Sequence, residues 1–187
     1  MSDAHEELEP ATWLTAHRAL LPASGRALDV ACGRGRHALW LAREGFHTTA
    51  IDRDARVVAA VNARARADRL PLVAAAMDLE TGLVTLGTAY DVVVVVHYLH
   101  RPLFPAILAA IRPGGVLVYE TFTRAQAARG RPTNPAFLLE PGELRRLVAG
   151  LEVLDAREGD FDGRMVASVV AARKPFRKRR NPARSRR

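Results

Sequence analysis

Apolar residues in this chain gather in short runs that polar and glycine-containing segments separate. One of these runs lies within Tyr90 to Val96, which reads YDVVVVV. Five consecutive valines leave no polar face, and this is typical of a parallel strand that is buried on both sides. We therefore expect a central strand of a parallel sheet over residues 90–96.

Shorter apolar runs alternate with helix-like stretches on both sides of this segment. Strands are predicted over 26–31, 48–51, 72–77, 90–96, 116–119, 151–154 and 166–171. Helices are predicted over 12–21, 36–44, 54–67, 103–111 and 142–149. The last two strands are too close in sequence for a helical crossover, so they are expected to form an antiparallel hairpin. The pattern predicts an α/β fold, a Rossmann-like open sheet that is mostly parallel, with helices on both faces.

The segment from Leu28 to His37, LDVACGRGRH, joins the first predicted strand to the first long helix. Gly33 and Gly35 allow a sharp turn and a close approach of a ligand to the backbone. The helix that follows presents free N–H groups at its N-terminus. A strand, a Gly-x-Gly turn and a helix in this order indicate a nucleotide-cofactor site. The same glycines also fit the dinucleotide pattern, so the turn by itself leaves NAD open.

Two acidic residues separate these alternatives. Asp29 lies four residues before Gly33, where the pyrophosphate of NAD favours no negative neighbour but a cationic ligand favours a carboxylate. Asp52 lies 19 residues after Gly33, about the spacing at which an acid binds ribose hydroxyls. A cation combined with a ribose favours S-adenosylmethionine over NAD.

Length and charge suggest one domain followed by a basic tail. The 187 residues are enough for a single core, which we place in residues 1–172 with a helical N-terminal segment over 1–22. Residues 173–187 hold nine of the 28 basic residues, including both lysines, and no acids, which leaves 19 basic against 20 acidic residues in the rest. This tail is expected to be disordered, and we leave open whether it binds nucleic acid or only aids solubility.

The chain carries no sign of export or membrane insertion. No apolar run approaches the roughly 18–20 residues of a membrane span, and the acidic start of the chain does not resemble a signal peptide. Cys32 is the single cysteine, which fits a reducing compartment. A cytoplasmic location is therefore expected, and the oligomeric state is left open.

The glycine turn carries a family likeness. Residues 29–35, DVACGRG, resemble the first motif of the class I S-adenosylmethionine-dependent methyltransferases. Ile51-Asp52 is similar to their ribose-binding acid, Met77-Asp78-Leu79 to their adenine-binding segment, and residues 112–115 to the turn before their fifth strand. The likeness extends from about residue 23 to residue 173, and it implies a seven-stranded sheet whose last strand is antiparallel. Residues 32–37 and 137–144 resemble the small bacterial branch of tellurite-resistance and thiopurine-type methyltransferases.

The resemblance implies S-adenosylmethionine as cofactor and a set of residues that bind it. Asp29 is expected near the methionine portion, Asp52 at the ribose and Asp78 at the adenine amino group. The predicted cofactor-binding residues are Asp29, Ala31, Cys32, Gly33, Gly35, Arg36, Asp52, Arg53, Met77, Asp78, Leu79 and His97. Ala31 departs from the family, which often has glycine there, and its methyl group is tolerable if its φ is negative.

The predicted acceptor chemistry follows the valine strand in HYLHRP, residues 97–102. His97 or His100 can take a proton, since histidine titrates near neutrality, Tyr98 can orient the substrate, and Arg101 can hold an anion. The alternative for each is a packing or capping role, and a thiol or chalcogen anion requires no base. The histidine spacing predicts no metal site.

These observations predict a methyltransferase that acts on a small-molecule acceptor, such as a thiol, a chalcogen or another soft nucleophile. Three alternatives stay open. They are an RNA methyltransferase that uses the basic tail, a non-catalytic nucleic-acid-binding protein on the same fold, and a nicotinamide-linked oxidoreductase. Acceptor pockets in this fold are formed by variable loops, here expected at residues 1–22, 97–104 and 123–140.

Overall fold

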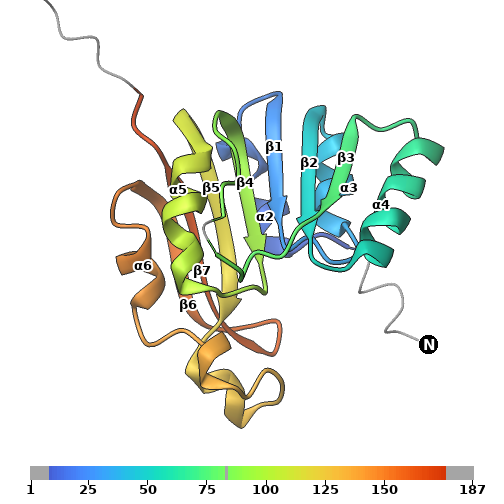
Figure 1. Cartoon of the computed structure of the whole chain (residues 1–187). Helices are drawn as coiled ribbons and strands as arrows, with labels where there is room; N and C mark the ends of the chain where they lie inside the picture. Colours follow the sequence, from blue (N-terminus) through green and yellow to red (C-terminus); the bar gives the residue numbers. More distant parts are fainter. Residues whose placement is uncertain (1–8, 83, 176–187) are drawn as a thin grey trace, which may run out of the picture.

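Seven strands form one sheet in the computed structural model, which describes residues 9–82 and 84–175 (Figure 1). The strands are β1 (Gly25–Val30), β2 (Phe46–Asp52), β3 (Leu72–Ala76), β4 (Tyr90–Val96), β5 (Ile111–Phe122), β6 (Glu152–Phe161) and β7 (Arg164–Ala172). Their order is β3-β2-β1-β4-β5-β7-β6. Strands β1 to β5 pair in parallel, whereas β7 is antiparallel to both β5 and β6. The predicted mostly parallel sheet with an antiparallel hairpin is confirmed.

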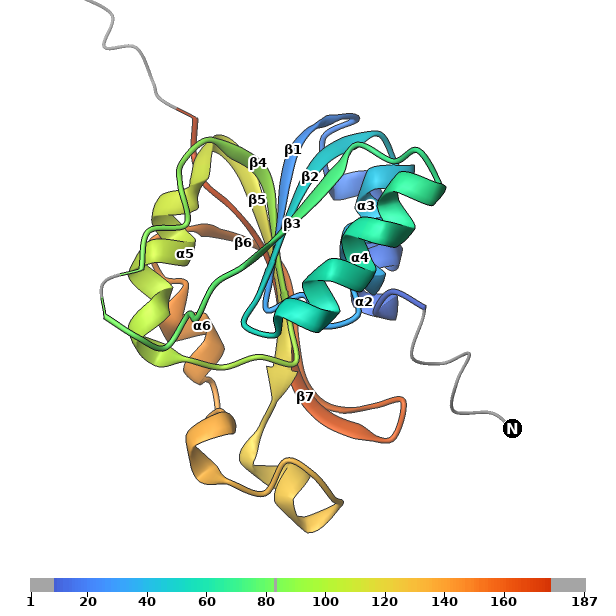
Figure 2. The ribbon, with the colours of Figure 1, turned by 45° about the vertical axis from the view of Figure 1, so that its right-hand side comes forward.

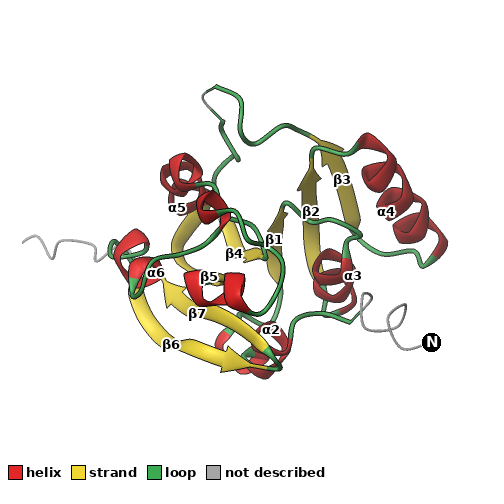
Figure 3. Cartoon of the chain, turned by 90° about the horizontal axis from the view of Figure 1, so that it is seen from below, coloured by secondary structure: helices red, strands yellow, loops and turns green. Residues whose placement is uncertain are grey.

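Helices cover both faces of this sheet. The α-helices are α2 (Thr12–Ala16), α3 (Arg36–Arg43), α4 (Ala55–Ala67), α5 (Phe104–Ala110) and α6 (Glu143–Leu147). Short 3₁₀ helices are η1 (Arg18–Leu20), η2 (Arg101–Leu103), η3 (Arg124–Ala128) and η4 (Pro135–Phe137). Helices α2, α3 and α4 lie on one side and α5 and α6 on the other (Figures 2 and 3).

Strand β4 lies at the centre of the core, and its valines pack on both faces. Val93 and Val95 join the apolar cluster beneath α5 and α6. Val92 and Val94 join the cluster beneath α2 and α3. Every residue of β4 is buried, as the run of valines predicts.

The ends of several elements differ from the sequence-based prediction. The helix expected over 12–21 is divided into α2 and η1 at His17, whose ring Nδ1 lies 2.7 Å from the carbonyl oxygen of Trp13. The final hairpin is longer than expected because β6 and β7 are joined only by Asp162 and Gly163. Both have positive φ, at +54° and +73°, which is typical of the two-residue Asp-Gly turn that connects twisted strands.

The strand order reverses between β1 and β4. The chain runs from β1 outward through β2 to β3, then returns to β4 on the other side of β1. In open α/β sheets, ligands bind outside the carboxyl ends of the strands at such a reversal. The glycine turn after β1 and His97 after β4 therefore lie at the position where a ligand is expected.

Candidate functional site

The glycine turn is held by one backbone hydrogen bond to the neighbouring strand β2 and by one within the turn itself. The Cys32 N–H donates to the carbonyl of Ile51 in β2 at 2.9 Å, and the Gly35 N–H donates to the carbonyl of Cys32 at 2.9 Å. Gly35 has φ +77°, and a Cβ atom there would lie 2.7 Å from Val61 of α4. Glycine at this position allows α4 to pack directly against the turn.

Asp29 links the end of β1 to the first turn of α3. Its Oδ2 accepts a hydrogen bond from the Ala38 N–H at 3.0 Å and so satisfies one of the free donors at the helix N-terminus. Its Oδ1 is buried and has no hydrogen-bond partner among the described residues. Burial raises the pKa of Asp29 to about 7, although the Ala38 hydrogen bond and Arg36 act in the opposite direction.

Asp52 joins the end of β2 to the same turn. Its Oδ2 accepts from the Gly33 N–H at 2.8 Å, and its Oδ1 accepts from the Asp54 N–H at 3.0 Å. Each carboxylate oxygen has room for a second hydrogen bond. Asp52 is therefore oriented by the backbone and can still accept from ribose hydroxyl groups.

Ala31 lies where the chain leaves β1 and enters the turn. Its φ is +55°, in the left-handed region that costs an L-residue about 1–2 kcal/mol. The negative φ that would make alanine equivalent to glycine here is thus not found. The strain follows from the turn, because the next residue, Cys32, must direct its N–H at Ile51.

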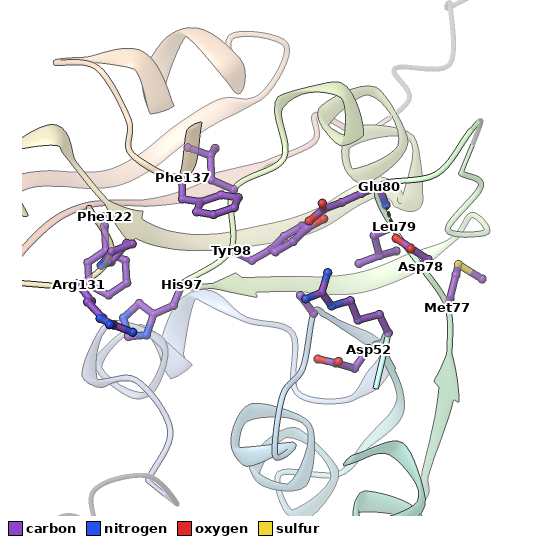
Figure 4. A pocket seen from close by; sticks show the side chains of 14 residues that line it. Asp52, Met77, Asp78, Leu79, Glu80, His97, Tyr98, Phe122, Arg131 and Phe137 are labelled. Atoms are coloured by element: carbon purple, nitrogen blue, oxygen red, sulfur yellow. Dashed lines mark hydrogen bonds between the residues drawn. The ribbon is translucent and has the colours of Figure 1, made fainter. Parts of the chain in front are cut away.

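A pocket of about 580 Å³ opens at this edge of the sheet (Figure 4). This volume lies within the range of about 300–1,000 Å³ that is usual for small-molecule sites. The lining residues are Ala31, Asp52, Arg53, Met77, Asp78, Leu79, Glu80, His97, Tyr98, Leu99, Phe122, Arg131, Pro132 and Phe137. They come from the ends of β1 to β5 and from the segment between β5 and α6.

The two ends of the pocket differ in chemistry. Figure 4 draws Asp52, Met77 and Asp78 on one side of Tyr98, and His97 and Arg131 on the other. The first end offers carboxylates beside apolar side chains, which suits a ribose and a purine. The second end is aromatic and basic, because it also includes Phe122 and Phe137.

His97 lies directly after β4 with a φ of +58°. Its ring stacks on Phe122 with a centroid distance of 4.6 Å, and its Nδ1 lies 3.5 Å from Nη2 of Arg36. Burial, followed by the charges of Arg36 and Arg164, lowers the pKa of His97 to about 4. The imidazole is therefore neutral at physiological pH.

Tyr98 lines the middle of the pocket. Its backbone carbonyl accepts a hydrogen bond from the Tyr119 hydroxyl at 2.8 Å, which fixes the chain at this position. Its own hydroxyl is buried and has no partner among the described residues. Burial, together with Glu80 and Asp78, raises the pKa of Tyr98 to about 12. The side chain is therefore a protonated donor at neutral pH.

Several predicted site residues do not line this pocket. Arg36 borders a second, smaller cavity, and Cys32 packs in the cluster between α3, α4 and β3, where burial raises the pKa of its thiol. Arg101 binds Glu143 through Nε at 2.6 Å and Nη2 at 2.8 Å, and it also donates to two backbone carbonyls. Its guanidinium thus holds the segment before α6 in place. The other predicted residues outside the lining are Asp29, Gly33, Gly35 and His100.

Six lining residues were not among the predicted site residues. They are Glu80, Leu99, Phe122, Arg131, Pro132 and Phe137. The sequence indicated the loops 97–104 and 123–140 as acceptor segments, and four of the six lie within them. Phe122 ends β5, and only the sheet order brings it beside His97.

Two features are absent from the described residues. None of the described helices is long and apolar enough to cross a membrane. Across residues 9–82 and 84–175, no group of three or more His, Cys, Asp or Glu side chains could hold a metal ion.

Two curated proteins are similar in sequence. Hemagglutinin 1 of Eikenella corrodens is 32% identical over 142 residues, which is 71% of this chain and 46% of that protein. YqeM of Bacillus subtilis, whose name assigns it as an inferred methyltransferase, is 25% identical over 65% of this chain and 52% of that protein. The chain spans about half the length of the curated relatives it matches.

Solved structures share the fold at low sequence identity. TehB of Haemophilus influenzae aligns with a TM-score of 0.72 and 20% identity over 87% of this chain and 61% of that chain. An S-adenosylmethionine-dependent methyltransferase of Mesorhizobium loti aligns with a TM-score of 0.68 and 20% identity over 87% of this chain and 98% of that chain. Residues 27–115 match the family described as "Methyltransferase domain", and this range holds most of β1, all of β2 to β4 and most of the pocket. This part of the chain is therefore a methyltransferase domain, and the chain has the fold of S-adenosylmethionine-dependent methyltransferases.

Proposed function

We propose that this protein transfers the methyl group of S-adenosylmethionine to a small acceptor that carries a soft nucleophile, such as a thiol or a chalcogen. The observation that carries the proposal is the division of one pocket into an acidic end and an aromatic, basic end. We assign the acidic end to the methyl donor and the aromatic, basic end to the methyl acceptor.

The acidic end fits the nucleoside half of the donor. Asp52 accepts from the ribose hydroxyls, Asp78 accepts from the adenine amino group, and Met77 and Leu79 supply apolar contacts to the base. Leu79 is buried, whereas Met77 is 37% exposed and free to cover a planar ring. S-adenosylmethionine, when bound here, supplies an electrophilic methyl group on a positively charged sulfur.

The middle of the pocket fits the sulfonium. Tyr98 lines it with an aromatic face, which attracts a cation, and Asp29 adds a buried carboxyl group behind the turn. The protein's contribution to an in-line displacement is to align the two reactants and to exclude water. Phe137 and Pro132 line the acceptor end, where their apolar side chains exclude water.

We infer a soft nucleophile because His97 and Tyr98, at the acceptor end, are poorly suited to remove a proton from the acceptor. At neutral pH the imidazole of His97 is uncharged and has little tendency to take up a proton, because its pKa is about 4. The phenol of Tyr98 keeps its proton, because its pKa is about 12. An amine acceptor must lose a proton to form a neutral product, and a thiolate need not. The aromatic lining also favours an acceptor with an apolar body.

Turnover with a matched series of acceptors tests this proposal. The full chain is incubated with S-adenosylmethionine and thiophenol, phenol or aniline, and release of S-adenosylhomocysteine is measured. We expect release with thiophenol at a rate at least tenfold above that with aniline. Faster release with aniline or phenol would overturn the soft-nucleophile assignment.

An RNA substrate is the second candidate, and the concentration of nine basic residues in 173–187 favours it. Arg173 belongs to the fold, because its backbone pairs with Gly114 and Gly115. The test therefore compares the full chain with one that ends at Pro175. Loss of salt-sensitive RNA binding in the shorter chain would support this alternative, and unchanged binding would contradict it.

A further inference from the structure

The two ring nitrogens of His97 have different surroundings. Nδ1 lies 3.5 Å from Nη2 of Arg36, and a guanidinium can only donate hydrogen bonds. Nδ1 must therefore be the acceptor of this pair, which places the ring proton on Nε2. Nε2 is buried and has no hydrogen-bond partner among the described residues. Neither nitrogen is left as a free proton acceptor toward the pocket.

The charges around His97 disfavour a second proton on its ring. His97 borders both the main pocket and a second cavity of about 270 Å³, which lies between residues 9–12, α3 and the β6–β7 hairpin. The charged side chains that line these cavities near His97 are Arg36, Arg131, Arg157 and Arg164, and the acids Glu9, Glu120 and Asp162. Oε2 of Glu120 accepts hydrogen bonds from the Ser168 hydroxyl at 2.6 Å and from Arg157 at 3.1 Å, whereas Glu9 and Asp162 are exposed to solvent.

The other titratable groups of the pocket are not placed to take a proton at the acceptor end. The Tyr98 hydroxyl is buried and protonated. Asp52 lies on the side of Tyr98 away from His97, at the end of the pocket that we assign to the donor. Asp78 and Glu80 lie on the opposite side of Tyr98 from His97 and Phe122 in Figure 4, and Asp78 Oδ1 accepts from the Glu80 N–H at 2.9 Å.

We propose that the acceptor reaches this site already ionised, as an anion, and that His97 orients it as a neutral hydrogen-bond donor rather than as a general base. This inference rests on the proposed function. It narrows the acceptor to groups that are acidic enough to ionise in solution, such as an aryl thiol. Arg131, which lines the pocket with His97 and has no ion-pair partner among the described residues, supplies positive charge for such an anion.

The chemical step then balances without any proton transfer by the protein. A lone pair of the thiolate sulfur forms the new bond to the methyl carbon. The bond between that carbon and the sulfonium sulfur of the donor breaks, and its electron pair stays on the donor sulfur. An anionic thiolate and a cationic sulfonium give two thioethers with uncharged sulfur. The product therefore carries no proton that a base must remove.

Two aryl thiols of different acidity test the inference. The pH dependence of kcat/KM is measured with 4-nitrothiophenol and with the less acidic 4-methoxythiophenol. We expect the rising limb of each profile to follow the ionisation of that thiol, so that the two midpoints differ as the thiols do in solution. A common midpoint for both thiols would show a base on the enzyme and would overturn the inference.

Substitutions of His97 and Glu80 distinguish a hydrogen-bond donor from a general base. His97→Gln keeps an N–H near the position of Nε2 but cannot accept a proton, so it should change kcat/KM for the two thiols by the same factor. Removal of a general base should instead reduce the rate with the less acidic thiol by a further factor of about 10²–10⁴. Glu80→Gln is measured in the same way, and a selective loss there would assign the base to Glu80 and contradict the inference. His47→Gln, on the exposed start of β2, is the matched control.

The tautomer of the His97 ring can be determined by NMR in the absence of catalysis. A ¹⁵N spectrum of the full chain at pH 7 should show His97 neutral, with its proton on Nε2. A proton on Nδ1, or a doubly protonated ring, would contradict the inference whatever the activity. Calorimetric titration with S-adenosylhomocysteine in the same samples separates the two claims, since a protein that binds no donor fails the proposed function instead.

Discussion

Oδ2 of Asp52 accepts a hydrogen bond from the backbone N–H of Gly33 at 2.8 Å. This contact joins the end of β2 to the glycine turn after β1, across 19 residues of sequence. It orients the carboxylate toward the pocket that both elements border. The same side chain thus stabilises the turn and lines the pocket with the acceptor oxygens that we propose for the ribose.

Asp52→Asn should weaken donor binding. The amide keeps one acceptor oxygen but loses the charge, and hydrogen bonds to charged groups are worth about 1.5–3 kcal/mol. We expect the Kd for S-adenosylhomocysteine to rise by about 10- to 100-fold in calorimetric titration. Asp54→Asn is the control, because Asp54 caps α4 and does not line the pocket. Equal affinity in the two variants would exclude Asp52 from the donor site.

Ala31→Gly should stabilise the fold. Ala31 has φ +55°, and glycine adopts this conformation without the steric cost of a Cβ atom. We expect the free energy of unfolding to rise by about 0.5–1 kcal/mol in urea denaturation. The same change at Ala59, an exposed position within α4, should lower the free energy by about 1 kcal/mol. A loss of stability at both positions would refute the strain at Ala31.

Gly33 and Gly35 should differ in their tolerance of alanine. Both have positive φ, but a Cβ at Gly35 would lie 2.7 Å from Val61, whereas a Cβ at Gly33 would meet nothing within 4 Å. Gly33→Ala should therefore cost about 1–2 kcal/mol from backbone conformation alone. Gly35→Ala should cost at least 1 kcal/mol more, because α4 must move. Thermal denaturation checks the difference, and equal midpoints for the two variants would contradict the packing of α4 on the turn.

Asp29→Asn should change how stability depends on pH. Burial raises the pKa of Asp29 from 3.8 to about 7, so the folded state keeps a proton that the unfolded state loses. The stability that this group contributes is fully present below about pH 4 and is lost as the pH rises to about 7. Asparagine does not titrate.

Urea denaturation of both proteins between pH 4 and pH 8 gives the measurement. The free energy of unfolding of the wild type, relative to the variant, should fall by up to about 1.4 kcal/mol for each pH unit within that window. Burial of His37 and His97 gives both proteins the same opposite slope, which the comparison cancels. A constant difference across the window would mean that Asp29 stays ionised in the folded protein.

Local sequence patterns predicted much of the fold and several of the residues that line the pocket. The valines of β4, the glycines at 33 and 35 and the capping Asp54 act through neighbours in sequence, so their roles can be read from the chain itself. Asp52 was predicted from its spacing of 19 residues after Gly33, and Asp78 from the resemblance of Met77-Asp78-Leu79 to the adenine-binding segment of the family. The structure places Asp52 and Asp78 in one pocket.

Contacts between residues far apart in sequence account for what the sequence did not predict. Arg101 was expected to face the acceptor, but it is bound to Glu143, 42 residues away. The stacking of His97 on Phe122 depends on the pairing of β4 with β5. The positive φ of Ala31 follows from a hydrogen bond between its neighbour Cys32 and β2, which no local pattern reveals.

The central claim is that the pocket at the carboxyl edge of the sheet binds the methyl donor. Isothermal titration of the full chain with S-adenosylhomocysteine, repeated with NAD, tests it most directly. We predict one site per chain with a Kd in the micromolar range or below for S-adenosylhomocysteine, no heat with NAD, and weaker binding in Asp52→Asn. No binding of S-adenosylhomocysteine, or tighter binding of NAD, would contradict the claim.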